Sequence, residues 1–307
     1  MLSGDHHEIA REGAMALDPY APEREQQEPY FIGLGRAMVS LGPSSRARYC
    51  PFSCRFCYVQ GPFPRYPARS PLEIVTWLKS RREQFHVVYI SGDTDSFAPG
   101  RTQEGLALLD MLRELEVDVL FTSRHLFSPE ERLRLQRIGD AYRCQGLRLI
   151  ACVSISQLDH PALEPPPIRS PLERVEQLAR FHEMQMHTVL TIRPFIPGIP
   201  ASEYRSIVQL AHNYADVVLG GDLYLDSAGV IEKLIGAAIG GPRPLVAGQA
   251  SDRPLDFSLG TQQWQVVEHR EARAQVAELC KNLSKPFFMR SEPALDWIRA
   301  NCVMHPR

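Results

Sequence analysis

Six apolar runs alternate with amphipathic segments along most of this 307-residue chain, and no other feature constrains its fold as strongly. Each run is nearly continuous in Val, Ile and Leu, as expected for strands buried on both faces of a parallel sheet. Strands that alternate with helices form right-handed βαβ units, which assemble into a barrel or into an open, doubly wound sheet. The runs span residues 37–41, 87–91, 117–122, 147–155, 188–192 and 217–225.

Three of the amphipathic segments begin with the same signal. Ser70, Ser128 and Ser170 are each followed by proline and, three positions after the serine, by glutamate. An N-cap serine, a proline in the first turn and a glutamate that reaches back form a capping box, so these serines predict three helix starts. Gly139 is the predicted end of the helix that begins after Ser128, because glycine readily adopts the backbone conformation of a helix C-cap.

The first apolar run is followed by three closely spaced cysteines. Cys50, Cys54 and Cys57 have the spacing C-x3-C-x2-C, and the aromatic residues Phe56 and Tyr58 flank the last thiol. Three thiolates can hold three irons of a [4Fe–4S] cluster and leave the fourth iron without a protein ligand, whereas most clusters have four cysteine ligands. An open metal position is where a reactant can bind. The spacing therefore predicts a reactive iron–sulfur site.

Two other interpretations of these thiols stay open. A closed zinc site needs a fourth ligand, and the nearest histidines, His7 and His86, are distant in sequence, although a remote residue could fold back to supply it. Ordinary buried cysteines are the other interpretation, but three thiols within eight residues on a loop rich in proline and arginine are a poor core pattern. The other four cysteines are scattered and are expected to be inert, reduced thiols: Cys144, Cys152, Cys280 and Cys302.

The cysteine triplet resembles the signature of the radical S-adenosylmethionine (radical SAM) enzymes. In that family the open iron binds the amine and carboxylate of S-adenosylmethionine. The resemblance implies a [4Fe–4S] cluster and S-adenosylmethionine as cofactors, and an electron donor such as flavodoxin or ferredoxin. It also favours the barrel over the doubly wound sheet, because the family has a partial (β/α)6 barrel with the cluster loop after the first strand. An aromatic ring at Phe56 or Tyr58 could pack against adenine or simply fill space.

Polar residues follow the second apolar run, where ligands bind in parallel barrels. Gly92 would allow close backbone approach, and Ser91, Asp93, Thr94 and Asp95 offer acceptors for an ammonium group. The segment occupies the position of the Gly-Gly-Glu-type motif that holds the amine of S-adenosylmethionine in the family, but that motif itself is absent. The alternative interpretation is a turn stabilised by its aspartates.

The next three runs also end in candidate binding residues. Arg124, beside Ser123, could pair with the carboxylate of S-adenosylmethionine or lie solvated on the surface. Ser154 and Ser156 share one face of a strand and could contact the ribose or the carboxylate. Arg193 is a second candidate cation.

The same strand ends are similar to those of the spore photoproduct lyase-like branch of the family, over roughly residues 35–226. Two departures weaken the transfer of lyase activity. The lesion-repair lyases have a cysteine hydrogen donor near the end of the second strand, and residues 87–99 contain none. A glycine usual before the fifth strand is replaced by Met186-His187. The matching segments are Thr94-Asp95, Thr122-Ser123-Arg124, Ser154-Ile155-Ser156, Leu163-Glu164-Pro165, Arg174 and Pro194-Phe195-Ile196-Pro197-Gly198.

The organisation expected from these patterns has three parts. Residues 1–34 are polar and rich in proline and glutamate, which favours an irregular N-terminal arm. Residues 35–226 would form the partial barrel. Residues 227–307 would form a C-terminal extension packed on the barrel, with helices near 271–283 and 293–300 and a strand at 286–289.

Composition limits the choice of partners and location. The formal net charge of −2 gives no support for a polyanionic partner, so nucleic acid is not expected. No run approaches the ~18 apolar residues of a membrane span, and the first 14 residues lack an apolar signal core, so a cytoplasmic protein is expected.

The predicted activity is reductive cleavage of S-adenosylmethionine to a 5′-deoxyadenosyl radical, which removes a hydrogen atom from a small polar metabolite, with specialised metabolism as one setting. A nucleic-acid lesion lyase of the spore photoproduct lyase type is the first alternative. A zinc-binding protein without catalysis is the second.

Overall fold

A mostly parallel sheet of eight strands organises the computed structural model, which describes residues 31–33, 35–43, 50–60, 67–240, 250–251 and 264–302. Strands β2 to β7 are neighbours in chain order, and each pairs in parallel with the next. Strand β11 extends the sheet in parallel beside β7, and β1 adds an antiparallel edge beside β2. The strands are β1 (Phe31–Gly33), β2 (Arg36–Val39), β3 (Val87–Ile90), β4 (Asp118–Ser123), β5 (Leu149–Ser154), β6 (His187–Ile192), β7 (Val217–Gly220) and β11 (Phe287–Phe288).

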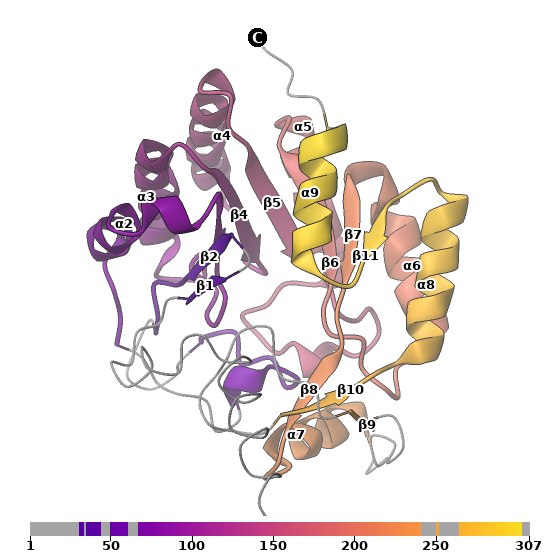
Figure 1. Ribbon diagram of the computed structural model, residues 1–307. Helices are drawn as coiled ribbons and strands as arrows, with labels where there is room; N and C mark the ends of the chain where they lie inside the picture. The colour runs from indigo at the N-terminus through magenta and orange to yellow at the C-terminus, as the bar shows by residue number, and fades with distance from the viewer. Residues whose placement is uncertain are drawn as a thin grey trace, which may run out of the picture.

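Helices connect the parallel strands and cover the outer face of the sheet (Figure 1). A doubly wound sheet reverses its strand order at a switch point, whereas six strands in unbroken chain order build a barrel wall. The predicted partial (β/α)6 barrel is therefore confirmed. The outer helices are α2 (Pro71–Lys79), α3 (Thr102–Leu112), α4 (Pro129–Cys144), α5 (Pro171–Glu183), α6 (Ala201–Ala211) and α8 (Arg270–Asn282). Short 3-10 turns are η2 (Tyr58–Gln60), η3 (Arg82–Gln84), η4 (Arg113–Leu115), η5 (Pro161–Leu163) and η6 (His212–Tyr214).

The three predicted helix starts are confirmed as complete capping boxes. The hydroxyls of Ser70, Ser128 and Ser170 each accept the backbone N–H three residues on, and the glutamate there accepts the serine N–H in return. The predicted end at Gly139 is wrong. Helix α4 continues because the next turn buries Tyr142, and Gly146, with φ +73°, provides the left-handed residue after the helix.

Alternate residues of the strands face two different cores. Val119 and Phe121 of β4 point to the outer helices, whereas Leu120 between them points to the inner face of the sheet. There Leu120 packs with Leu295 and Ile298 of the C-terminal helix α9 (Ser291–Asn301), which lies across the inner face (Figure 1).

Helix α9 closes the amino end of the barrel. Arg299 Nε lies 2.8 Å from Asp118 Oδ2 at the start of β4, and its Nη2 donates to the His86 carbonyl just before β3. At the other end of the helix, Arg36 pairs with Glu292 at 2.6 Å. Helix α9 does not cover the carboxyl ends of the strands, where the candidate active site lies.

The apolar run 217–225 forms two strands, so the prediction of one strand is wrong. A Cβ at Gly220 would lie 2.6 Å from the Phe195 ring, and one at Gly221 would lie 2.7 Å from Arg193. These close contacts occur where the chain leaves the main sheet. The following strand β8 (Leu223–Asp226) joins a small antiparallel sheet with β10 (Trp264–Val267) and β9 (Ala250–Ser251), next to α7 (Val230–Ile239).

The predicted C-terminal helices and strand correspond to α8, β11 and α9. Most of the predicted N-terminal arm, residues 1–30 and 34, lies outside the described residues, and 31–33 form β1. The three-part division stays a prediction. Within the described parts of the chain, no helix is both long enough and apolar enough to cross a bilayer.

Candidate active site at the carboxyl ends of the strands

The cysteine loop follows β2 and is held by the aromatic residues between its thiols. Phe52 and Phe56 are buried in the outer core, so the loop folds back on itself and brings Cys54 inside with them. Cys50 and Cys57 are half-buried. The cysteine backbone forms a tight turn, with Cys57 N–H donating to the Cys54 carbonyl at 3.2 Å. The loop therefore presents three thiols from a fixed backbone.

Burial changes the acidity of these thiols. Burial raises the pKa of Cys50 to about 12, although the Asp95 backbone N–H that donates to this thiol acts in the opposite direction. Burial also raises the pKa of Cys54 and of Cys57, and the positive charge of Arg124 opposes the shift at both. Buried thiols of this kind become thiolates when a metal replaces the proton.

Two of the predicted acceptors after β3 are used within the protein. Thr94 is buried, and its hydroxyl lies 2.6 Å from Ser40 Oγ. Asp95 accepts hydrogen bonds from the Ser123 hydroxyl at 3.0 Å and from the Arg124 N–H at 2.7 Å. Burial raises the pKa of Asp95, and these donors counteract it. Thr94 and Asp95 therefore hold the loops of β2, β3 and β4 together.

The rest of this segment lies against the cysteine loop. The Tyr58 hydroxyl donates to the Gly92 carbonyl and so ties the two loops together. Ser91, with φ +77°, accepts from the Ser96 N–H at 3.0 Å. The carboxylate of Asp93 lies close enough to Cys57 to raise the pKa of that thiol. Asp95 likewise raises the pKa of Cys50 through its charge, but its carboxylate is already engaged by Ser123 and Arg124, so Asp93 is the acidic acceptor beside the cysteine loop that these two residues do not occupy.

Arg124 lies beside the cysteine loop in a buried ionic network, so it is not the solvated side chain of the alternative interpretation. Its Nε donates to Glu164 at 2.9 Å, and its guanidinium carbon lies 5.5 Å from the centre of the Phe56 ring. Glu164 is buried and also pairs with the buried Arg174, and the Gln157 amide donates to it at 3.0 Å. Two guanidinium groups thus share one carboxylate, so the network of Arg124, Glu164 and Arg174 has one net positive charge.

Glu164 and Arg174 are functional candidates that the strand ends alone did not reveal. The only signal in the sequence was their place in the segments similar to the spore photoproduct lyase-like branch. Glu164 lies directly after η5, whose Leu163 carbonyl accepts the Arg55 N–H of the cysteine loop at 2.9 Å. The segment that contains Glu164 therefore packs against the cysteine loop and holds its backbone.

The remaining predicted residues meet at the carboxyl ends of β5 and β6. The Ser156 hydroxyl donates to the Arg193 carbonyl at 2.6 Å, and the carbonyl of buried Ser154 accepts from Arg174. The guanidinium of Arg193 donates to the Gly220 carbonyl at 2.8 Å and to the Met289 carbonyl at 3.2 Å. Arg193 thus binds the backbone at the ends of β7 and β11.

The C-terminal extension reaches the cysteine loop, which sequence analysis did not anticipate. Trp264 of β10 packs edge-on against Tyr58, with ring centres 6.3 Å apart. Both α7 and β8 also contact η2, which contains Tyr58. Trp264 is buried, and its indole N–H has no hydrogen-bond partner among the residues that the structure describes. The sequence around Trp264 carries no local signal of this position.

Comparison with known proteins supports the fold. No protein-family model and no curated protein matches the sequence. A variant of spore photoproduct lyase with bound AdoMet and dinucleoside spore photoproduct superposes with a TM-score of 0.60 at 10% identity, over 83% of this chain and 76% of that one. SuiB of Streptococcus suis bound to S-adenosylmethionine gives 0.55 at 12% identity, over 94% of this chain and 57% of SuiB. Both are radical SAM enzymes, and this chain shares their fold.

Proposed function

We propose that this protein is a radical SAM enzyme. Cys50, Cys54 and Cys57 would hold a [4Fe–4S] cluster whose fourth iron binds S-adenosylmethionine. The single observation that carries the proposal is the position of this triplet, on a loop at the carboxyl end of the barrel wall. The bound cluster would supply the electron that cleaves S-adenosylmethionine. The resulting 5′-deoxyadenosyl radical would abstract a hydrogen atom from the substrate.

The three thiols are not gathered around one point, as a single zinc ion would require. Zinc–sulfur bonds are about 2.3 Å long and tetrahedral, so sulfurs around one zinc lie about 3.8 Å apart. Within the described ranges, the group of metal-binding side chains whose ligand atoms all lie within 4.8 Å of one another does not include the three loop cysteines. Ligands of a [4Fe–4S] cluster each bind a different iron and do not need to meet at a single ion. The fold shared with two radical SAM enzymes supports the same choice.

The surrounding residues then have defined tasks. Arg124 places a positive charge beside Cys54 and Cys57, which favours their thiolates. The Tyr58–Gly92 hydrogen bond fixes the loop after β3, where Asp93 is the best candidate to accept the amine of S-adenosylmethionine. Buried Trp264 packs against Tyr58 and would shield this side of the loop from water.

The proposed substrate is a small polar metabolite. The near-neutral net charge of −2 supports it over a nucleic acid, whose binding needs a basic surface. A lesion lyase is the second candidate, because one structural neighbour holds a dinucleoside lesion. Residues 87–99 lack the cysteine expected of such lyases. Strong, salt-dependent binding of oligonucleotides would favour the second candidate.

Anaerobic reconstitution tests the activity. The protein should bind about four irons per chain and release methionine and 5′-deoxyadenosine when reduced by dithionite or by flavodoxin or ferredoxin. Each of Cys50→Ala, Cys54→Ala and Cys57→Ala should abolish both iron binding and cleavage. Cys144→Ala, which removes an exposed thiol, is the matched control and should change neither. Zinc in place of iron, or cleavage that survives the loop variants, would overturn the proposal.

A further inference from the structure

Three metal-binding side chains converge at the amino end of the barrel, opposite the cysteine loop. His187 is the first residue of β6, Asp216 directly precedes β7, and Cys302 directly follows α9. Strands β6 and β7 are parallel neighbours, so His187 and Asp216 start from the same edge of the sheet. Cys302 reaches them because α9 lies across the inner face.

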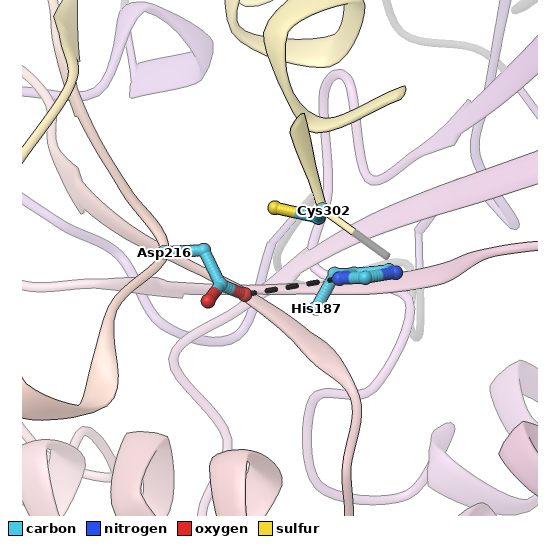
Figure 2. A group of neighbouring side chains, drawn as sticks. All are labelled: His187, Asp216 and Cys302. Atoms are coloured by element: carbon cyan, nitrogen blue, oxygen red, sulfur yellow. Dashed lines mark ion pairs between the residues drawn. The ribbon is translucent and has the colours of Figure 1, made fainter. Parts of the chain in front are cut away.

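The structure assigns a zinc-binding site to His187, Asp216 and Cys302. One ligand atom from each lies within 4.8 Å of the other two, and no other group among the described residues meets this condition. His187 Nδ1 lies 3.9 Å from Asp216 Oδ2 (Figure 2). Ligands around one zinc ion lie about 3.3 to 3.8 Å apart, so small side-chain rotations would complete the site.

Two of the three ligand residues, Asp216 and Cys302, are already held by hydrogen bonds to the backbone. Asp216 Oδ2 accepts the Thr188 N–H at 2.8 Å, which orients the carboxylate beside β6. The Cys302 N–H donates to the Ile298 carbonyl at 2.9 Å and so stays at the helix end. Second contacts of this kind position metal ligands and tune their basicity. The three side chains are half-buried, so an ion would be reachable yet partly desolvated.

The donor set selects the metal. One imidazole nitrogen, one sulfur and one carboxylate oxygen are the ligand types of zinc, whereas magnesium and calcium take oxygen alone. Three protein ligands leave the fourth position to water. Burial raises the pKa of Cys302 to about 11, so the free thiol is protonated at neutral pH and zinc would displace that proton.

Zinc at this site would connect the C-terminal helix to the sheet. A bound ion would tie the carboxyl end of α9 to β6 and β7, and α9 covers the inner core. Zinc would therefore stabilise the closed amino end of the barrel without touching the cysteine loop.

Zinc binding to the full-length protein tests this assignment. A competition titration with a chromophoric chelator should find one zinc per chain, and X-ray absorption at the zinc edge should show one sulfur together with nitrogen and oxygen ligands. Cys302→Ser and His187→Gln should each weaken binding at least tenfold and abolish the zinc-dependent rise in Tm. Cys144→Ser is the control and should bind like the parent.

Specific outcomes would overturn the site. Three sulfurs around zinc would place the ion in the cysteine loop. Equal binding by the parent and both variants would mean an adventitious ion only. Asp216→Asn, which keeps the shape of the side chain, covers the case in which one of the other variants fails to fold, and unchanged binding by this variant would also reject the site.

Discussion

Glu164 neutralises part of the charge of two guanidinium groups, those of buried Arg174 and half-buried Arg124, and this makes it the most consequential single residue beside the cysteine loop. Removing one partner of a buried ionic network leaves the others uncompensated, which typically costs about 3–5 kcal/mol. Glu164→Gln should therefore lower the free energy of unfolding by about that amount in urea denaturation. Glu183→Gln, in an exposed pair with Arg180, should cost less than about 1 kcal/mol. Equal losses in the two variants would contradict this role.

The same residue predicts a pH dependence. Burial raises the pKa of Glu164, but Arg174 and Arg124 outweigh it, so the net pKa is lowered. A carboxyl with a lowered folded-state pKa contributes its stability in full above its ordinary value of about 4.3 and loses it as pH falls through the folded value. The stability difference between the parent and Glu164→Gln should thus be constant from pH 7 to 5 and shrink below about pH 4. A difference that grows in acid would refute the sign.

The positive charge of Arg124 should affect the reduction potential of a bound cluster. Its guanidinium lies beside Cys54 and Cys57, so in a loaded protein it should favour the more negative, reduced cluster. Arg124→Gln should retain iron but lower the reduction potential in an EPR-monitored titration, and Arg134→Gln, which removes an exposed cation from α4, should leave the potential unchanged. An unchanged or higher potential in Arg124→Gln would be inconsistent with this effect.

At the scale of elements, the three capping boxes define where the outer helices begin. Ser128→Ala removes the acceptor for the Glu131 N–H and should destabilise the protein by about 1 kcal/mol in chemical denaturation. Ser206→Ala is the matched control, because this hydroxyl only donates to the Ser202 carbonyl one turn back within α6. Alanine favours the helix interior, so that change should be neutral or slightly stabilising. A larger loss at Ser206 than at Ser128 would count against the capping argument.

At the scale of the whole molecule, the docking of α9 onto the inner face joins the two halves of the chain. Leu295 is 5% exposed and packs in the inner core, so Leu295→Ala should cost about 2–5 kcal/mol through lost burial and the cavity left behind. Leu133→Ala, at a position 51% exposed on α4, should change stability by less than about 0.5 kcal/mol. Thermal unfolding of the two variants separates these outcomes. A small effect at Leu295 would mean that α9 does not close the barrel.

Local patterns were enough to predict the alternating strands and helices and the three helix starts, whereas the choice of a barrel over a doubly wound sheet came from the family resemblance carried by the cysteine triplet. Strand burial, capping and cysteine spacing are set by neighbours a few residues apart, so they can be read from a short window of sequence. The contacts of Asp95 and Thr94 could not be predicted in this way. Their acceptor atoms suited a ligand in the sequence, but in the folded chain they meet Ser123 and Ser40.

Long-range packing also decided where the chain leaves the main sheet and which face α9 covers. Residues 217–225 were predicted to form one strand, yet the chain leaves the main sheet at Gly220 and Gly221, where a Cβ would lie within 3 Å of Phe195 and Arg193. The meeting of His187 and Cys302, 115 positions apart in the 307-residue chain, arises in the same way. Each of these features depends on which surfaces pack together, and that choice is made by the total burial of the folded molecule and not by any short segment.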